Sequence, residues 1–422
     1  MPQDKPPASV DRYKHEEFVV ALPYAAAVSA RARNEFGIAC DPQDSRKLNL
    51  TLLRPDGLGQ SAETLRREAL KRMTQKTGDR ILDIVHAPNQ AGASPLDNLM
   101  FCLRYDFAAS CAGWVPPMGK NRLAQNVTGM PHIDGGGIGN PDPASRPAPP
   151  RKADLRRGAG IRVGILDTQL FPHADLAGRY LASRVDLLGA QDSYSRFAGH
   201  ATFVAGRIVH QAPAAELDMR WTLDDEHAST TIWDLVHRMV DFRDSGVKIL
   251  NLSLGCYTSD GQPPMVLARA IQLLAPDIVI VASAGNHGDP KENVRAGQAG
   301  LRPEAAFWPA AFDDVVAVGA DRGPSGELAA FSPRLPWVTF TAKGEKVVST
   351  YLEGKVKIPG NGAGLTQFDG YANWSGTSFA AATVTGELAA LTKPGEPAWP
   401  AVAELKERAR RSPEGPVRIA SL

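Results

Sequence analysis

The sequence has few of the features that mark a disulfide-stapled, membrane-spanning or nucleic-acid-binding protein. Its four cysteines are too few and too scattered along 422 residues for a disulfide framework, and their spacing matches no zinc site. No run of about twenty apolar residues occurs, which argues against a transmembrane helix. The 47 lysines and arginines nearly balance the 46 aspartates and glutamates, so net charge gives no reason to expect a nucleic-acid or membrane partner.

The N-terminal region also lacks the charge pattern of an export signal. Phe18 to Ser29 is apolar and ends in small residues, as a signal peptide does, but Pro23 interrupts it. Acidic residues precede this run where a signal peptide carries basic ones, namely Asp4, Asp11, Glu16 and Glu17. We therefore expect a cytoplasmic protein, with secretion as the alternative.

Residues 1–133 are expected to form a small α/β module that contains no chemical constellation. Helices are predicted at Ala25–Phe36, closed by Gly37, and along the face that Leu65, Ala69 and Met73 share. Leucines alternate with polar residues between Leu48 and Leu52, which predicts a half-buried strand. Further short strands are predicted at Glu17–Leu22, Arg80–Val85 and Leu99–Tyr105.

Residues 134–160 change in composition and are predicted to form an extended, mobile linker. A glycine run from Gly135 to Gly139 leads into a stretch with five prolines. These glycines do not follow a strand and open a helix, so a phosphate-binding loop is not expected.

Residues 161–395 alternate between apolar strands and amphipathic helices. Strands are predicted at Ile161–Leu166, Asp218–Thr222, Lys248–Leu254, Asp277–Ser283 and Val315–Gly319. Helices are predicted after His200, from a cap at Ser229 or Thr230 to Gly246, and at Pro264–Leu274. Strands buried on both faces and separated by helices indicate a mainly parallel sheet with helices on both faces. Residues 396–422 add a polar helix at about Ala401–Arg410 and a loose tail.

The chain is organised around the stretch from Asn373 to Gly386. Gly376, Thr377 and Ser378 form a turn that opens onto a helix of small residues, which suits close packing. A serine there is commonly only a helix cap. The unpaired N–H groups of a helix N-terminus would also stabilise an oxyanion beside the Ser378 hydroxyl.

Three more polar residues lie where the sites of parallel α/β sheets form. Asp167 ends the first strand of this region, and Asn286 follows the strand at 277–283. His200 begins a helix in the segment Gly199 to Gly206. Ligands bind outside the carboxyl ends of such strands, so these side chains are expected to converge with Ser378.

With these motifs in the order Asp, His, Asn, Ser, the region from Ile161 to about Leu391 resembles a subtilisin-like serine protease, a subtilase. The segments Leu250–Gly255, Trp308–Ala310 and Phe331–Ser332 are similar to family segments as well. The resemblance implies a serine endopeptidase that cuts polypeptides through an acyl-enzyme intermediate and needs no cofactor.

The same resemblance implies a role for each motif residue. Ser378 is the nucleophile, His200 the base that takes its proton, and Asp167 the group that orients the imidazole. The side-chain amide of Asn286 and the Ser378 N–H donate to the oxyanion.

In subtilases an extended peptide pairs with the strand that corresponds here to Ser253, Leu254 and Gly255. Ala284 and Gly285 form the opposite wall of the primary specificity pocket. The preferred side chain is left open.

The chain departs from the family pattern at several positions near these motifs. Gln169 stands where a glycine is usual, so a different turn is expected after Thr168 if positive φ is needed there. Phe203 replaces a second histidine, Ala201 a glycine, Phe379 a methionine and Ala382 a proline.

The family's calcium-binding loop is not expected, because the segment between Gly206 and Ala212 is short and offers no carboxylates. No metal is carried over. His173 and Asp175 lie in a family segment without a catalytic role, and His287 is expected to shape the cleft.

The role of the N-terminal module stays open between three readings. It is a removable inhibitor, a retained regulatory or target-recognition domain that could bind a regulatory partner, or a structural appendage. A removable inhibitor predicts a cut within Asp134–Gly160. A different class of function, a pseudoprotease that binds peptides without cutting them, is also kept. The physiological substrate, the activating signal and the oligomeric state are not predicted.

Overall fold

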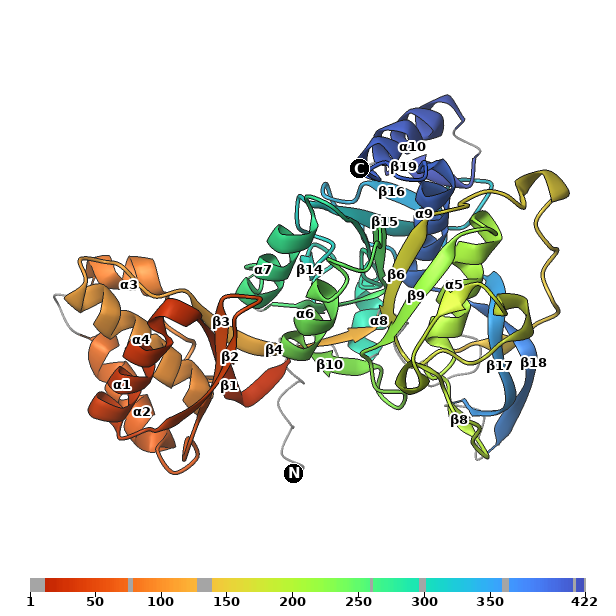
Figure 1. The fold of residues 1–422 in the computed structure, drawn as a ribbon. Coiled ribbons are helices and arrows are strands. Elements are labelled where there is room, and N and C mark those ends of the chain that lie inside the picture. The colour runs from red at the N-terminus through yellow and green to blue at the C-terminus, as the bar shows by residue number, and fades with distance from the viewer. Residues whose placement is uncertain are drawn as a thin grey trace.

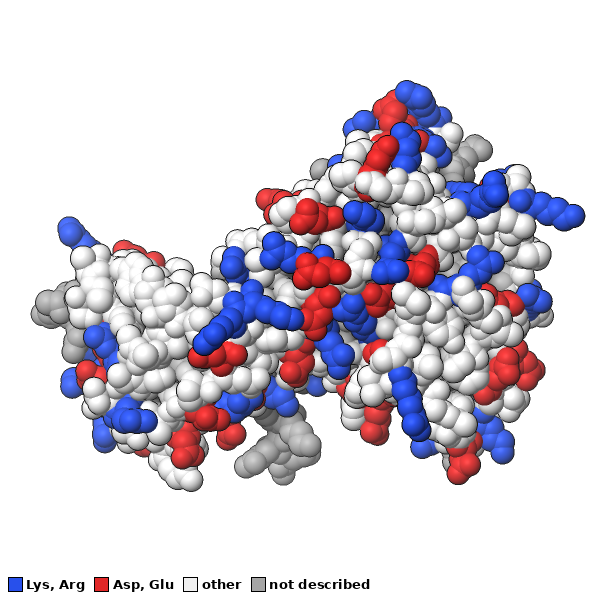
Figure 2. Space-filling model, in the orientation of Figure 1, with Lys and Arg blue, Asp and Glu red and all other residues white. Residues whose placement is uncertain are grey.

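The computed structural model describes residues 12–74, 79–126, 139–258, 261–295, 301–358, 364–412 and 415–420. Figure 1 shows a small N-terminal module beside a larger domain, with strand β4 leading from one into the other. Figure 2 shows acidic and basic side chains interspersed over the visible face of both parts. No helix among the described residues is both long and apolar enough to cross a bilayer. The glycines predicted to begin the linker, Gly135–Gly137, lie outside the described residues.

An eight-stranded sheet forms the centre of the larger domain and is mainly parallel, as predicted. Its order is β19-β16-β15-β13-β11-β6-β9-β7, and only β19 is antiparallel to its neighbour. The strands are β6 (Arg162–Asp167), β7 (Tyr180–Leu181), β9 (Glu216–Trp221), β11 (Ile249–Leu252), β13 (Val279–Ser283), β15 (Val315–Asp321), β16 (Phe340–Lys343) and β19 (Val417–Ile419). Because β19 pairs with β16, the C-terminal tail is not loose, and that prediction was wrong.

Helices cover both faces of this sheet. One face packs against α5 (His200–Gln211), α9 (Thr377–Leu391) and α10 (Trp399–Arg411), and the other against α6 (Ile232–Val240) and α7 (Met265–Leu274). The short helix α8 (Pro290–Arg295) follows β13. Helix α9 is buried from Thr377 to Ala389, which its small residues permit. A Cβ on Gly386 would lie 2.8 Å from the Ile208 carbonyl oxygen, so α5 and α9 can approach this closely only with glycine there.

A long hairpin that the sequence analysis did not predict leads into α9. It consists of β17 (Val347–Lys357) and β18 (Leu365–Trp374), with β5 (Asp142–Pro143) and β8 (Tyr194–Ser195) at its edges. Pairing of β5 with β18 fixes part of the segment that was predicted to be a mobile linker.

The N-terminal module is built from helices and a small antiparallel sheet. The strands are β1 (Tyr13–Ala21), β2 (Cys40–Ser45) and β3 (Leu50–Pro55), and the helices are α1 (Ala25–Phe36), α2 (Ala62–Met73), α3 (Asp79–Val85) and α4 (Pro95–Ser110). Helices α1, α2 and α4 pack against one face of the sheet, and α3 packs on α2 and α4. The strands predicted at 80–85 and 99–105 are therefore helical. Ser94 begins α4 with a capping box to Asp97, which stabilises a helix over an apolar run that resembles a strand.

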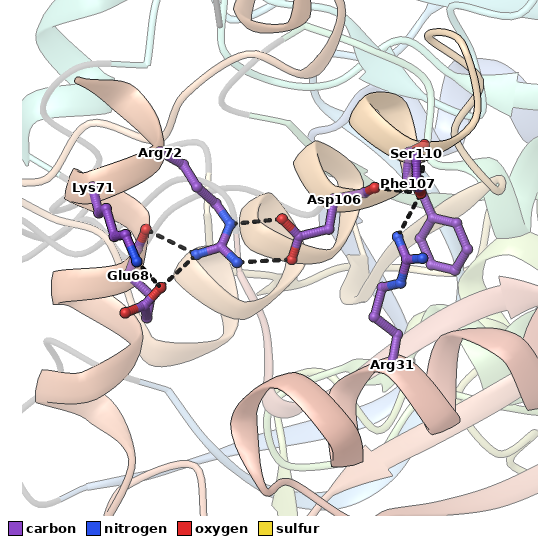
Figure 3. Close-up of polar contacts among 7 residues, drawn as sticks. All are labelled: Arg31, Glu68, Lys71, Arg72, Asp106, Phe107 and Ser110. Atoms are coloured by element: carbon purple, nitrogen blue, oxygen red, sulfur yellow. Dashed lines mark hydrogen bonds and ion pairs between the residues drawn. The ribbon is translucent and has the colours of Figure 1, made fainter. Parts of the chain in front are cut away.

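The helices of the module are joined by polar contacts among themselves (Figure 3). The Arg72 guanidinium in α2 donates to both carboxylate oxygens of Asp106 in α4, at 2.8 and 2.9 Å, and to Glu68. Arg31 in α1 donates to Ser110 in α4 and lies over the Phe107 ring, 4.2 Å from its centroid. These contacts, with a separate apolar core, hold the module together as a unit.

Strand β4 (Met118–Asn126) joins the two parts, because it belongs to the sheets of both. Its first half pairs with β1, and its last residues pair with β10 (Ser229–Thr231) and β12 (Leu254–Tyr257). The segment at 229–231 was expected to begin a helix, but Thr231 caps α6 instead, accepting the Asp234 N–H at 3.0 Å. The strand predicted at 248–254 is likewise divided into β11 and β12.

The outer face of the module's sheet is buried against the larger domain. Leu48, Leu50 and Leu52 lie in one apolar cluster with residues of α6 and α7. The strand is therefore buried on both faces and not half-buried, because the periodicity could not reveal what covers its second face.

Candidate active site

Asp167 and His200 lie in direct contact at the carboxyl edge of the parallel sheet. Asp167 ends β6, His200 begins α5, and Asp167 Oδ1 lies 2.6 Å from His200 Nδ1. The Thr168 N–H also donates to this oxygen at 2.7 Å, which fixes the carboxylate. A carboxylate only accepts, so Nδ1 carries the hydrogen and Nε2 is left as the basic nitrogen.

Ser378 is the second residue of α9 and lies beside β12. Its hydroxyl donates to the Ser253 carbonyl oxygen at 3.4 Å, which is a long hydrogen bond. Within the described ranges, His200 Nε2 has no hydrogen-bond partner. The bond expected between Ser378 and His200 is therefore not formed here, and the hydroxyl must leave Ser253 to make it.

Asn286 is oriented by the first residue of α9. Its Oδ1 accepts from the Thr377 N–H at 3.0 Å and lies 3.0 Å from the Thr377 hydroxyl. A Cβ on Gly376 would meet Asn286 Nδ2 at 3.6 Å, so the amide nitrogen faces the turn that precedes Ser378. This arrangement suits an amide that donates to an oxyanion beside Ser378.

A buried polar network below Ser378 was not recognised in the sequence. Asn251 Nδ2 donates to Ser253 Oγ at 3.0 Å, and Ser253 Oγ donates to the Ser378 carbonyl at 3.2 Å. Thr385 in α9 donates to Asn251 Oδ1 at 2.9 Å. The network joins α9 to Asn251 and Ser253 and so fixes the position of Ser378 relative to the sheet. In the sequence, the only indication of this network was a single asparagine, Asn251, within an apolar strand.

Two of the departures from the family pattern pack against each other. The rings of Phe203 and Phe379 lie 4.2 Å apart between centroids, and the His200 ring contacts Phe379 and Trp374 at 5.7 and 5.8 Å. The imidazole is thus held from one side by aromatic contacts, as well as by Asp167.

The turn after Asp167 needs no glycine in this chain. Gln169 does not adopt the left-handed conformation, and its side chain donates to the Val185 carbonyl at 2.7 Å. Its N–H donates to Asp225, whose carboxyl pKa is raised to about 6 by burial. A turn different from the family's glycine-containing one was expected here, and these contacts of Gln169 hold the turn that the chain forms instead.

The strand expected to receive substrate is already paired with the chain's own β4. Leu254 is paired with Asn126 and Gly255 with Gln125, while β10 lies along the other side of β4. Ser253, Leu254 and Gly255 are buried, as are Ala284 and Gly285. Asp167, His200 and Ser378 have no exposed surface at all, so a substrate reaches them only after a rearrangement.

The neighbouring histidine and aspartate candidates have other contacts. His173 Nδ1 accepts the Asp175 N–H at 3.0 Å, and Asp175 pairs with Arg146 and Tyr371. The segment between Gly206 and Ala212, where the family's calcium-binding loop was not expected, continues α5 to Gln211. No three potential metal ligands converge anywhere in the described part of the chain.

His287, beside Asn286, is buried between Tyr257 and the Ala305 carbonyl oxygen. Nδ1 lies 3.1 Å from the Tyr257 hydroxyl and Nε2 2.9 Å from the carbonyl oxygen, so Nε2 carries the hydrogen of a neutral ring. Burial lowers the pKa of His287 to about 4, against 6.5 for a free histidine. As the pH falls, the unfolded chain therefore binds a proton at this position at a higher pH than the folded chain does. The free energy of unfolding decreases as the pH drops from 6.5 to 4.

We expect this group alone to remove about 2–3 kcal/mol of unfolding free energy between pH 7 and pH 4.5. Urea denaturation of Ser378→Ala protein, which cannot digest itself, measures the loss. In Ser378→Ala protein that also carries His287→Gln, the loss of unfolding free energy over the same pH range should be smaller by about 2–3 kcal/mol. Equal losses in the two proteins would show that His287 does not titrate in this way.

Two sequence comparisons indicate one family for the larger domain. A sequence model described as the subtilase family matches residues 158–412. The chain is 28% identical over 257 residues to the major intracellular serine protease of Bacillus subtilis, covering 58% of this chain and 72% of that protein. It is 32% identical over 251 residues to alkaline elastase YaB of a Bacillus species, covering 57% and 56%. A crystal structure of a lanthipeptide protease aligns at 23% identity with a TM-score of 0.48, over 61% of this chain and 82% of that one.

Proposed function

The chain belongs to the subtilase family of serine proteases, and from that premise we propose that it hydrolyses peptide bonds with Asp167, His200 and Ser378 as its triad. The observation that carries the proposal is the buried 2.6 Å contact between Asp167 and His200, at the edge of the sheet where the first turn of α9 contains Ser378. Its substrates are polypeptides. No cofactor takes part in the proposed reaction.

In the proposed reaction, His200 Nε2 takes the Ser378 hydroxyl proton as the serine oxygen attacks the carbonyl carbon. The Asn286 amide and the Ser378 N–H stabilise the oxyanion that forms. His200 then gives the proton to the departing amine, which leaves an acyl-enzyme. Water, activated by the same imidazole, hydrolyses this ester, and Asp167 stabilises the imidazolium in both steps.

The N-terminal module would regulate this activity by placing β4 where substrate binds. Support comes from the pairing of β4 with β10 and β12, and from the complete burial of the triad. This favours the inhibitory and regulatory readings over a structural appendage. We propose residues 1–133 as the module, 134–160 as the connection and 161–395 as the catalytic core, to which the segment 396–422 adds α10 and β19.

A fluorophosphonate tests the proposal, because it reacts only with a serine that is activated as a nucleophile. In the chain carrying Ala124→Arg, in which β4 is expected to leave β10 and β12, we expect one label on Ser378 per chain. Labelling should be lost when Ser378→Ala is added and at least 100-fold slower when His200→Ala is added. The intact masses of the wild-type and Ser378→Ala proteins after storage show whether only the wild type is cut within 134–160, as a removable inhibitor requires. Label that stays on another residue in Ser378→Ala would contradict the assignment.

A pseudoprotease remains the second candidate, because His200 Nε2 makes no bond to Ser378 in this structure. Peptide binding without labelling of Ser378 would favour it.

The cellular location remains a prediction. Cys40, Cys102, Cys111 and Cys256 form no disulfide with one another, which is compatible with a reducing compartment. The relatives include an intracellular serine protease and a minor extracellular protease, both from Bacillus subtilis.

A further inference from the structure

The two segments expected to form the walls of the specificity pocket each contain a glycine, Gly255 and Gly285, and aromatic side chains lie against both. A Cβ built on Gly255 would come closest to the Trp308 carbonyl oxygen, and within 2.6 Å of the Phe307 ring. A Cβ built on Gly285 would come within 2.6 Å of the His287 ring and 3.3 Å of the Tyr257 hydroxyl. The directions in which the walls would carry side chains therefore lead into one group of three rings.

Tyr257, His287 and Phe307 pack together as a single cluster. The Tyr257 ring lies 4.8 Å from that of Phe307 and 5.1 Å from that of His287, between centroids. All three are buried, with exposed fractions of 7%, 0% and 2%. The space between the walls is thus filled by the protein's own side chains.

The cluster is anchored and cannot swing aside freely. Tyr257 and Phe307 face each other across the paired strands β12 and β14 (Phe307–Trp308). His287 is held by Tyr257 on one nitrogen and by the Ala305 carbonyl on the other. Moving any ring would break packing or leave a buried polar group without its partner.

From this arrangement we propose that the primary specificity pocket accepts only small side chains, such as those of alanine and serine, because Tyr257, His287 and Phe307 occupy its depth. The inference rests on the proposed function, which puts the side chain of the residue before the scissile bond between these two walls. A leucine or phenylalanine there would have to displace a ring, whereas a methyl group would not.

Three peptides that differ only in alanine, leucine or phenylalanine before the scissile bond test this proposal. They are assayed with the full chain carrying Ala124→Arg, in which β4 is expected to leave its place between β10 and β12, here called the channel. They are also assayed with the unsubstituted chain. We expect kcat/KM for the alanine peptide to exceed that for the other two at least 30-fold. Phe307→Ala should raise the phenylalanine peptide at least 10-fold relative to the alanine peptide. Phe312→Ala, which shortens an aromatic packed on the neighbouring Trp308 instead, should leave that ratio unchanged.

The outcomes separate the pocket proposal from the proposed function. Protein whose Ser378 reacts with a fluorophosphonate, but which cuts the phenylalanine peptide as well as the alanine peptide, overturns the pocket proposal alone. Labelled protein that cuts none of the peptides overturns it too, since a methyl group should enter. Protein that is neither labelled by the fluorophosphonate nor able to cut any of the peptides contradicts the proposed function itself. If Phe307→Ala fails to fold, Phe307→Val tests the same space, and the wild-type ratio decides without either variant.

Discussion

Replacing Ala124 with arginine should raise the peptidase activity of the full chain by about 100-fold. The Ala124 side chain has no exposed surface and lies in the apolar cluster that β4 shares with β12 and α6. A guanidinium cannot be buried there without a partner, so the strand should leave β10 and β12 and open the channel. Initial rates of cleavage of a short fluorogenic peptide, measured before any self-processing, give the comparison.

The adjacent residue supplies a matched control. Gln125 is half-buried, its side chain points away from that of Ala124, and it contacts Arg12 near the surface. Gln125→Arg introduces the same group with less burial and should change the rate by less than about 5-fold. If hydrogen exchange shows β4 released in Ala124→Arg while activity stays at the wild-type level, the module does not inhibit.

In the opened chain, Asp167→Asn should lower kcat by about 10⁴-fold with little change in KM. An amide at this position can donate to His200 Nδ1, which favours the ring tautomer with its hydrogen on Nε2. That nitrogen then cannot take the serine proton, and no charge remains to stabilise the imidazolium. His200→Ala should cost as much or more, and combining the two changes should add little, because the residues act as a unit.

Asp175→Asn is the control for loss of an aspartate. Asp175 lies in the segment after β6 but pairs with Arg146 and Tyr371. Its replacement should change kcat less than about 3-fold. An Asp167→Asn enzyme within 10-fold of the parent would remove Asp167 from the mechanism.

The catalytic half could be predicted largely from local sequence. Its strands are continuous apolar runs bounded by polar residues, and Asp167, His200 and Asn286 stand where such strands end or a helix begins. Helix Ala25–Phe36 was predicted to the residue, because Gly37 adopts the left-handed conformation that ends it.

The remaining features depend on partners far away in the chain. Nothing in Leu123 to Asn126 indicates that this segment pairs with residues 229–231 and 254–255, more than 100 positions later in the sequence. The apolar run of α4 hides its helical periodicity because it is buried nearly all round. There, Ser94, Pro95 and Asp97 were the readable signal, since together they form a helix start.

Strand β4 is covalently part of the molecule whose channel it fills. An intramolecular strand competes with free peptides at an effective concentration on the order of millimolar. Peptides at micromolar concentrations would then bind only those molecules in which β4 has separated from β10 and β12. The apparent affinity of a peptide is reduced in proportion to the fraction of such molecules. The output of such an enzyme follows the release of the strand more closely than it follows the abundance of substrate.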